Sequence, residues 1–158
     1  MIDQSLVKSI QENYQKTLSQ IAEAAHAVGR EPESVKLVVV TKKQPLFLIQ
    51  AAIAAGVKIF GENYPEEAVK KMQSLGEKTT VEWHMIGHVQ SRKASLVPAN
   101  FALLHSLDRL KTARRLNRFS AELGRKLPVL LEFNVGGESS KHGWNASDES
   151  RWEELLPD

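Results

Sequence analysis

The chain has 158 residues, of which 42% are hydrophobic and 25% are charged, the balance of an ordinary globular protein with one real core. Lys and Arg total 21 against 19 Asp and Glu, and this net charge of +2 is spread along the chain, so neither a nucleic-acid nor a membrane surface is predicted. The lack of cysteine excludes disulfides, zinc–thiolate sites and thiol nucleophiles, and the N-terminus has no apolar signal-peptide run, so we expect a cytoplasmic protein.

From the N-terminus, apolar residues between Leu6 and Val28 recur at three- and four-residue steps, which predicts an amphipathic helix ending at Gly29. The largely β-branched run from Val35 to Thr41 is typical of a strand buried on both faces, as in parallel sheets. The remaining elements alternate, with helices predicted over 45–55, 66–75, 91–97, 108–123 and 149–156, and strands over 57–60, 81–86, 101–105 and 128–135.

A leading helix followed by five strand–helix units with short connections predicts a parallel α/β sheet. We find no linker and no break in composition, so residues 1–158 are expected to form a single domain. A doubly wound sheet and a β/α barrel both fit this alternation, and periodicity alone leaves the choice open.

Reactive and polar side chains gather where the predicted strands end. They are Lys42 after the first strand, Asn63 after the second, His84 and His88 on and after the third, His105 at the end of the fourth, and Asn134, Lys141 and His142 at or after the fifth. In a parallel barrel these ends open on one face, where β/α-barrel proteins collect their chemistry. The clustering therefore predicts a site at this face.

Each of these residues also has an ordinary structural interpretation. Taken alone, Lys42 fits best as the first exposed residue after a strand. As a Schiff-base lysine it would need a neutral amine, which burial and the neighbouring cation Lys43 would favour. His84 and His88 share a face of a strand, but without a nearby carboxylate or third ligand we expect structural histidines rather than a metal site. The Gly136-Gly137-Glu138 stretch lacks the lysine and spacing of a phosphate loop.

Five motifs in order carry a resemblance to one family. They are Leu37-Val38-Val39-Val40-Thr41-Lys42-Lys43-Gln44-Pro45, Phe60-Gly61-Glu62-Asn63-Tyr64, Trp83-His84-Met85-Ile86-Gly87-His88-Val89-Gln90-Ser91-Arg92-Lys93, Leu104-His105-Ser106-Leu107-Asp108, and Asn134-Val135-Gly136-Gly137-Glu138 with Lys141-His142-Gly143. Together they resemble the YggS/PROSC family of pyridoxal 5′-phosphate (PLP) binding proteins, also called PLP homeostasis proteins.

The resemblance implies a TIM-type β/α barrel similar to the N-terminal domain of alanine racemase. It implies PLP held as a Schiff base on Lys42, with Asn63, Ile86 and His88 around the cofactor, and no catalytic residues. Such a protein would buffer PLP or deliver it to apo-enzymes in vitamin B6 and amino-acid homeostasis, and its full-length form is expected to be a monomer. The alternative is a PLP-dependent amino-acid racemase, which would need a second acid/base group across the cofactor.

The sequence departs from the family pattern in residues and in length. Thr41 stands where the family usually has Ser, Lys43 where it has Thr, and Pro65 where it has an aliphatic residue. Only about five of the eight strand–helix units of the family barrel are present, and the later phosphate-binding segments have no counterpart. We therefore expect an incomplete barrel, with open edges on its first and fifth strands, from a truncated gene or a partial sequence.

Overall fold

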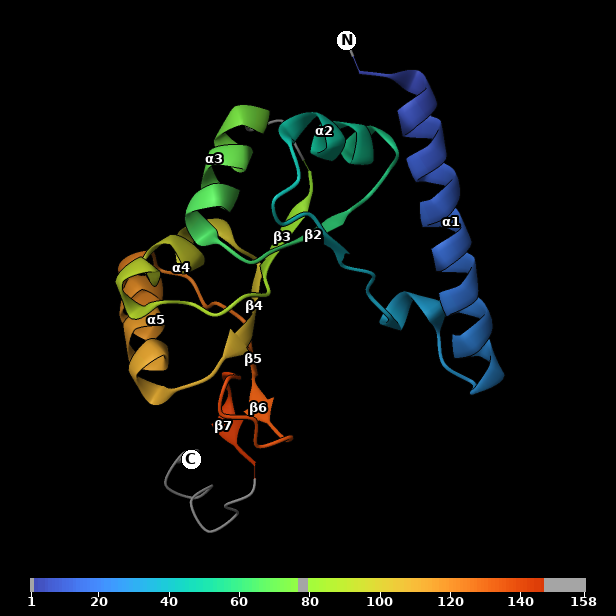
Figure 1. Ribbon diagram of the computed structural model, residues 1–158. Coiled ribbons are helices and arrows are strands. Elements are labelled where there is room, and N and C mark those ends of the chain that lie inside the picture. Colours follow the sequence, from blue (N-terminus) through green and yellow to red (C-terminus); the bar gives the residue numbers. More distant parts are fainter. Residues whose placement is uncertain (1, 77–79, 147–158) are drawn as a thin grey trace. The chain divides into compact units, whose positions relative to one another are not determined.

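A computed structural model describes residues 2–76 and 80–146 and contains a parallel sheet of five strands (Figure 1). The strands are hydrogen-bonded in sequence order and comprise β1 (Val39–Val40), β2 (Ile59–Glu62), β3 (Glu82–Met85), β4 (Leu103–Leu107) and β5 (Val129–Leu131). This order, with helices between successive strands, is that of β/α-barrel units, so the predicted α/β fold class is confirmed.

The chain divides into two compact units, one made of residues 1–61 and 70–82 and the other of residues 62–69 and 83–158. No helix among the residues described is long and apolar enough to cross a membrane.

In the first unit, helix α1 (Gln4–Ala27) begins at Asp3, whose carboxylate accepts hydrogen bonds from the backbone N–H groups of Ser5 and Leu6. Helix α2 (Leu46–Ala54) packs against α1 and buries Ile49, Ala51 and Ala52. A short 3₁₀ helix, η1 (Pro32–Ser34), follows α1, and the last turns of α3 (Pro65–Leu75) also belong to this unit.

The first predicted strand is much shorter than expected and is not buried on both faces. The backbone N–H of Val35 closes η1 by donating to the carbonyl of Pro32, so this end of the segment cannot join the sheet. Only Val39 and Val40 pair with β2, and Val40 is 48% exposed because β1 is the first strand in the sheet order.

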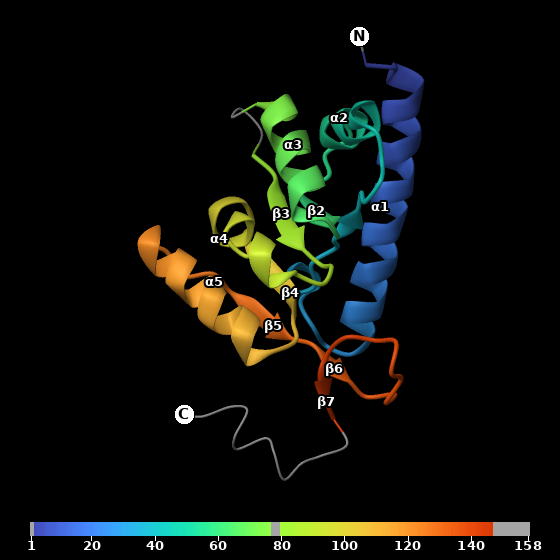
Figure 2. The ribbon, with the colours of Figure 1, turned by 60° about the vertical axis from the view of Figure 1, so that its left-hand side comes forward.

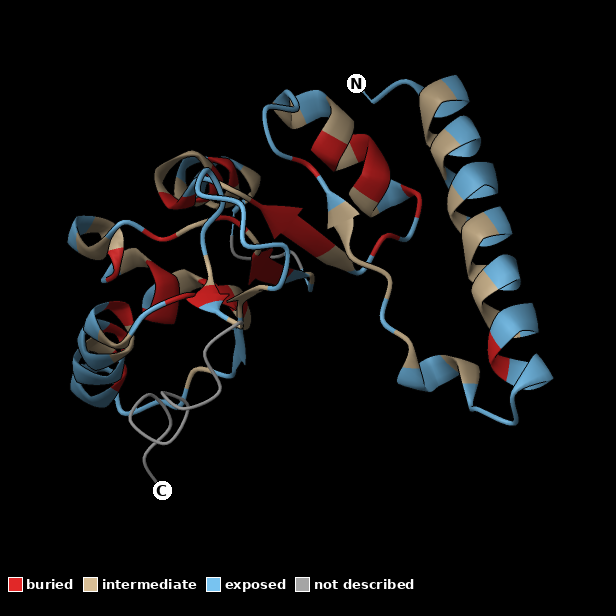
Figure 3. Ribbon diagram, turned by 60° about the horizontal axis from the view of Figure 1, so that its bottom comes forward, coloured by how far each residue is buried: buried red, intermediate tan, exposed pale blue. Residues whose placement is uncertain are grey.

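In the second unit, helices α4 (Leu96–Asn100) and α5 (Leu110–Glu122) lie side by side next to β4 and β5 (Figures 1 and 2). A 3₁₀ turn, η2 (Ser91–Lys93), precedes α4. The apolar core includes Met85, Phe101 and Leu104, and Figure 3 shows buried residues on strands and helix faces. The three residues of β5, by contrast, are all exposed: Val129, Leu130 and Leu131.

Three details of the second unit differ from the sequence prediction. Asp108 does not cap α5, because Arg109 is the N-cap residue and binds the Asp108 carboxylate instead. The predicted strand over 128–135 is divided into β5 and β6 (Phe133–Asn134), and β6 pairs with the unpredicted strand β7 (Trp144–Asn145). The predicted helix over 149–156 lies outside the described residues.

Two histidines on neighbouring strands contact each other within the sheet of the second unit. Nδ1 of His84 lies 3.0 Å from Nε2 of His105, with His84 buried and His105 half-buried. One nitrogen must donate and the other accept, so the hydrogen bond requires at least one neutral ring. Burial, together with the charge of His84, lowers the pKa of His105 below its ordinary value of 6.5.

This pair predicts that the protein loses stability on mild acidification. Because the pKa of His105 is lower in the folded chain than in the unfolded chain, the unfolded state takes up the proton first, and stability falls as the pH drops below 6.5. Urea unfolding between pH 8 and pH 5 should show this fall, and His105→Gln should make it smaller. An equal fall in the variant would contradict the assignment.

Candidate functional site

Lys42 lies in the first unit, directly after β1, and its side chain is exposed. The backbone turns here: Lys43 has a φ of 60°, and the N–H of Gln44 donates to the carbonyl of Thr41 at 3.0 Å. Lys42 is therefore the first exposed residue after the strand, as its ordinary structural interpretation expects, and the burial that would favour a neutral amine is absent. Because β1 ends two residues earlier and the chain turns, Lys42 stands outside the core.

The strand end that carries Lys42 is fixed by contacts of the residue before it. The N–H of the buried Thr41 donates to the carbonyl of Gly61 at 3.0 Å, which continues the β1–β2 pairing. Nζ of Lys71, a buried lysine on α3, donates to the Thr41 carbonyl at 2.9 Å. Sequence reasoning missed Lys71, since nothing in the local pattern of a charged helix distinguishes a buried lysine from a solvated one.

In the second unit, the ends of β2 and β3 approach each other very closely. The N–H of Ile86 donates to the carbonyl of Glu62 at 2.9 Å, and Glu62 is completely buried. A Cβ atom added to Gly87 would lie 2.5 Å from the carbonyl oxygen and 2.7 Å from the Cα of Asn63. Only glycine fits at position 87, because backbone atoms occupy the space of a side chain.

A cavity of about 350 Å³ opens beside this contact, a size within the range of small-molecule sites. Its lining residues are mostly polar and comprise Asn63, Tyr64, Pro65, Gly87, His88, Gln90, Lys93 and His142. The structure thus brings the predicted site residues Asn63 and His88 together at one cavity. Ile86 is half-buried just before Gly87 and is not among the lining residues, and Lys42 belongs to the other unit.

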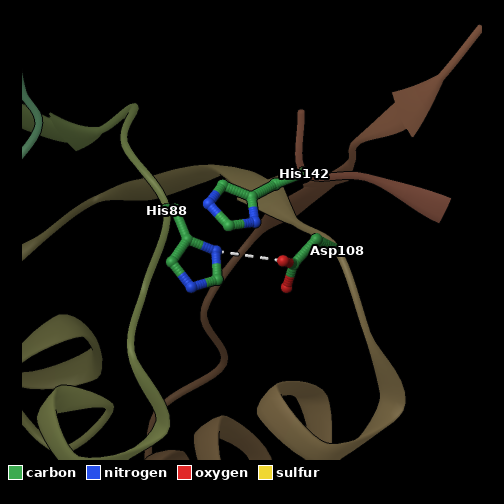
Figure 4. Close-up of side chains that lie close together, drawn as sticks. All are labelled: His88, Asp108 and His142. Atoms are coloured by element: carbon green, nitrogen blue, oxygen red, sulfur yellow. Dashed lines mark ion pairs between the residues drawn. The ribbon is translucent and has the colours of Figure 1, made fainter. Parts of the chain in front are cut away.

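His88 also contacts His142, which sequence analysis placed in the same strand-end group, and Asp108, which it did not (Figure 4). Its Nδ1 lies 3.0 Å from Oδ2 of Asp108 at the end of β4. The ring of His142 stacks on the His88 ring, with centroids 3.9 Å apart and planes inclined by 14°. The Lys-His-Gly stretch marked His142 as a strand-end residue, but only the tertiary structure shows that it covers His88.

The carboxylate beside His88 stays ionised at neutral pH. Burial alone would raise the pKa of Asp108, but the hydrogen bonds and the charge of Arg109, with a contribution from His88, hold it below its ordinary value. Nη2 of Arg109 lies 2.7 Å from Oδ2, and its Nε donates to Oδ1 at 3.1 Å. A fixed negative charge therefore lies against one edge of the His88 imidazole.

His84 and His88, the pair considered from the sequence, do not contact each other but have separate partners. His84 and His105 pair with each other in the sheet, whereas His88 lies with Asp108 and His142. In the Gly136-Gly137-Glu138 stretch, Gly137 has a φ of +66° and the side-chain amide of Asn134 donates to the Glu138 carbonyl at 2.9 Å. This stretch is a turn between β6 and β7.

Comparison with known proteins agrees with this fold. Residues 9–156 match the family model of the alanine racemase N-terminal domain. The chain is 40% identical over 153 residues to the pyridoxal phosphate homeostasis protein of Vibrio alginolyticus, covering 95% of this chain and 66% of that protein. It is 41% identical over 142 residues to the protein of the same name from Pseudomonas aeruginosa, covering 90% of this chain and 61% of that one.

Two solved structures are also similar. PipY of Synechococcus elongatus with PLP bound matches with a TM-score of 0.65 and 34% identity, covering 86% of this chain and 65% of that one. An unknown protein from Bifidobacterium adolescentis matches with a TM-score of 0.80 and 32% identity, covering 96% and 65%. The chain spans about three fifths to two thirds of the length of these relatives.

The predicted resemblance to the PLP homeostasis proteins is confirmed by these matches. By its match over 148 of its 158 residues (9 to 156), the chain belongs to the family of the alanine racemase N-terminal domain.

Proposed function

We propose that this chain binds PLP through a Schiff base on Lys42, with Asn63, Ile86 and His88 around the cofactor. The observation that carries the proposal is the cavity at the ends of β2 and β3, lined by Asn63 and His88, in a chain 34% identical to a protein solved with PLP bound. Lys42 follows β1, the strand next to β2 in the sheet order.

The residues at the cavity suit a flat, anionic pyridine compound. Gly87 allows two backbone segments to come into contact, which places Asn63 and His88 at the same cavity. Asn63, Tyr64 and Gln90 offer amide and hydroxyl groups, and Lys93, ion-paired with Glu66, adds a cation near the lining. An exposed Lys42 is accessible to an aldehyde from solvent.

The proposed role is that of a carrier rather than a catalyst. PLP supplies an aldehyde, which condenses with the Lys42 amine and releases water. Hydrolysis reverses this bond, so the same lysine can take up PLP and release it to apo-enzymes. The names of the relatives, PLP homeostasis proteins, support this role. We also propose that residues 1–158 form one PLP-binding domain, because the family match extends through both units.

Borohydride reduction in the presence of PLP should label Lys42. Reduction converts the Schiff base into a stable amine, and peptide mass spectrometry should place the added mass on Lys42 in preference to the adjacent Lys43. Lys42→Ala should lower total labelling by at least about tenfold.

Lys43→Ala is the matched control, since it removes an adjacent lysine in the same turn and should leave labelling of Lys42 in place. Labelling that is equal in the wild type and in Lys42→Ala would contradict the assignment. Racemisation of alanine faster than with free PLP would instead support the enzyme alternative.

Asn63→Ala and His88→Ala should each weaken PLP binding, because each removes a polar group from the cavity lining. The loss of one hydrogen bond of about 1 kcal/mol corresponds to an affinity lower by about fivefold. Titration of the protein with PLP, followed by absorbance, measures this change. Asn117→Ala, an exposed residue of α5, is the control. Unchanged affinity in both cavity variants would place the cofactor elsewhere.

A further inference from the structure

We propose that His88, Asp108 and His142 form a binding site for a divalent transition-metal ion such as Zn²⁺ or Co²⁺. One donor atom from each of these side chains lies within 4.8 Å of the others (Figure 4). The three residues follow β3, end β4 and precede β7, so the fold gathers them from separate parts of the second unit. Two imidazoles and one carboxylate are a donor set that suits Zn²⁺ and Co²⁺ better than Mg²⁺ or Ca²⁺.

Two of the donors already have the spacing that a metal ion requires. Nδ1 of His88 and Oδ2 of Asp108 are 3.0 Å apart, whereas two ligands at about 2.0 Å from a tetrahedral ion lie roughly 3.3 Å from each other. Nδ1 is buried and makes no hydrogen bond of good geometry within the described part of the chain. A metal ion bound between Nδ1 and Oδ2 would take the place of their direct contact.

The third donor must move for the metal to bind. The rings of His88 and His142 are nearly parallel, with planes inclined by 14° and centroids 3.9 Å apart, so one ion cannot lie in both ring planes at once. His142 is exposed on the turn between β6 and β7, where its ring can rotate away from the stack. Binding therefore exchanges a ring contact for a metal–nitrogen bond.

Charge sets the strength of the site. The Asp108 side chain is only 2% exposed and its carboxylate attracts a cation, but the Arg109 guanidinium bound to it repels one. A metal ion at Oδ2 competes with the Nη2 group of Arg109, which donates to that oxygen at 2.7 Å, whereas the hydrogen bond from Nε to Oδ1 can remain. We expect micromolar rather than nanomolar affinity. The cavity lined by His88 and His142 leaves room for water to complete the coordination.

Equilibrium dialysis of the whole purified chain against Co²⁺ and against Zn²⁺, without PLP, tests the site. The chain has no cysteine, so the visible spectrum of bound Co²⁺ reports nitrogen and oxygen ligands alone. We expect one ion per chain, and about tenfold weaker binding in His142→Ala and in His88→Ala. His142 is exposed, so its replacement leaves the core unchanged.

His26→Ala is the matched control, because His26 is an exposed histidine on α1 in the other unit. The affinity of this variant for the metal ion should equal that of the wild type. The proposal is overturned if the wild type binds no stoichiometric ion, or if His142→Ala binds the ion as tightly as His26→Ala does. Since the assay contains metal alone, its outcome does not depend on whether Lys42 binds PLP.

Discussion

The close approach of Gly87 to the backbone of Asn63 is the constraint on which the candidate site depends. The hydrogen bond from Ile86 to Glu62 holds the ends of β2 and β3 together, and Gly87, which follows Ile86 just after β3, must then pass within contact distance of Asn63. A side chain at position 87 would push these segments apart. Asn63 and His88 line one cavity because glycine allows the two strand ends to meet.

Further contacts in the second unit position the residues that surround His88. The hydroxyl of Ser106 on β4 donates to the Gly87 carbonyl, and the indole N–H of Trp144 donates to the carbonyl of Leu107 at 2.9 Å. Gly143 also packs tightly, since a Cβ there would lie 2.7 Å from the backbone nitrogen of Asn134. These contacts hold the end of β4 and the turn before β7, from which Asp108 and His142 reach His88.

Sequence reasoning predicted the alternation of helices and strands, because the buried strands and amphipathic helices carry local periodic patterns. Its predictions were wrong where contacts between residues far apart in the sequence determine exposure or hydrogen-bond partners. Val40 is exposed because β1 is the first strand in the sheet, and Asp108 binds Arg109 and contacts His88 instead of capping a helix. The pairing of His88 with His142 joins residues 54 positions apart (142 − 88), which no local pattern reveals. The motifs predict Lys42 as a site residue, and this stays a prediction; its exposure agrees with the ordinary interpretation of a strand-end lysine.

The most direct test of whether the contact between Gly87 and Asn63 supports the site is the effect of Gly87→Ala on urea unfolding and on PLP binding. Gly136→Ala is the matched control. At position 136 an added Cβ meets nothing closer than 3.7 Å, so that variant should behave as the wild type. Gly87→Ala should lower the free energy of unfolding by about 1–3 kcal/mol, as overpacking does, and should weaken PLP binding. If Gly87→Ala matched Gly136→Ala in both measurements, the close contact of the two strand ends would not support the site.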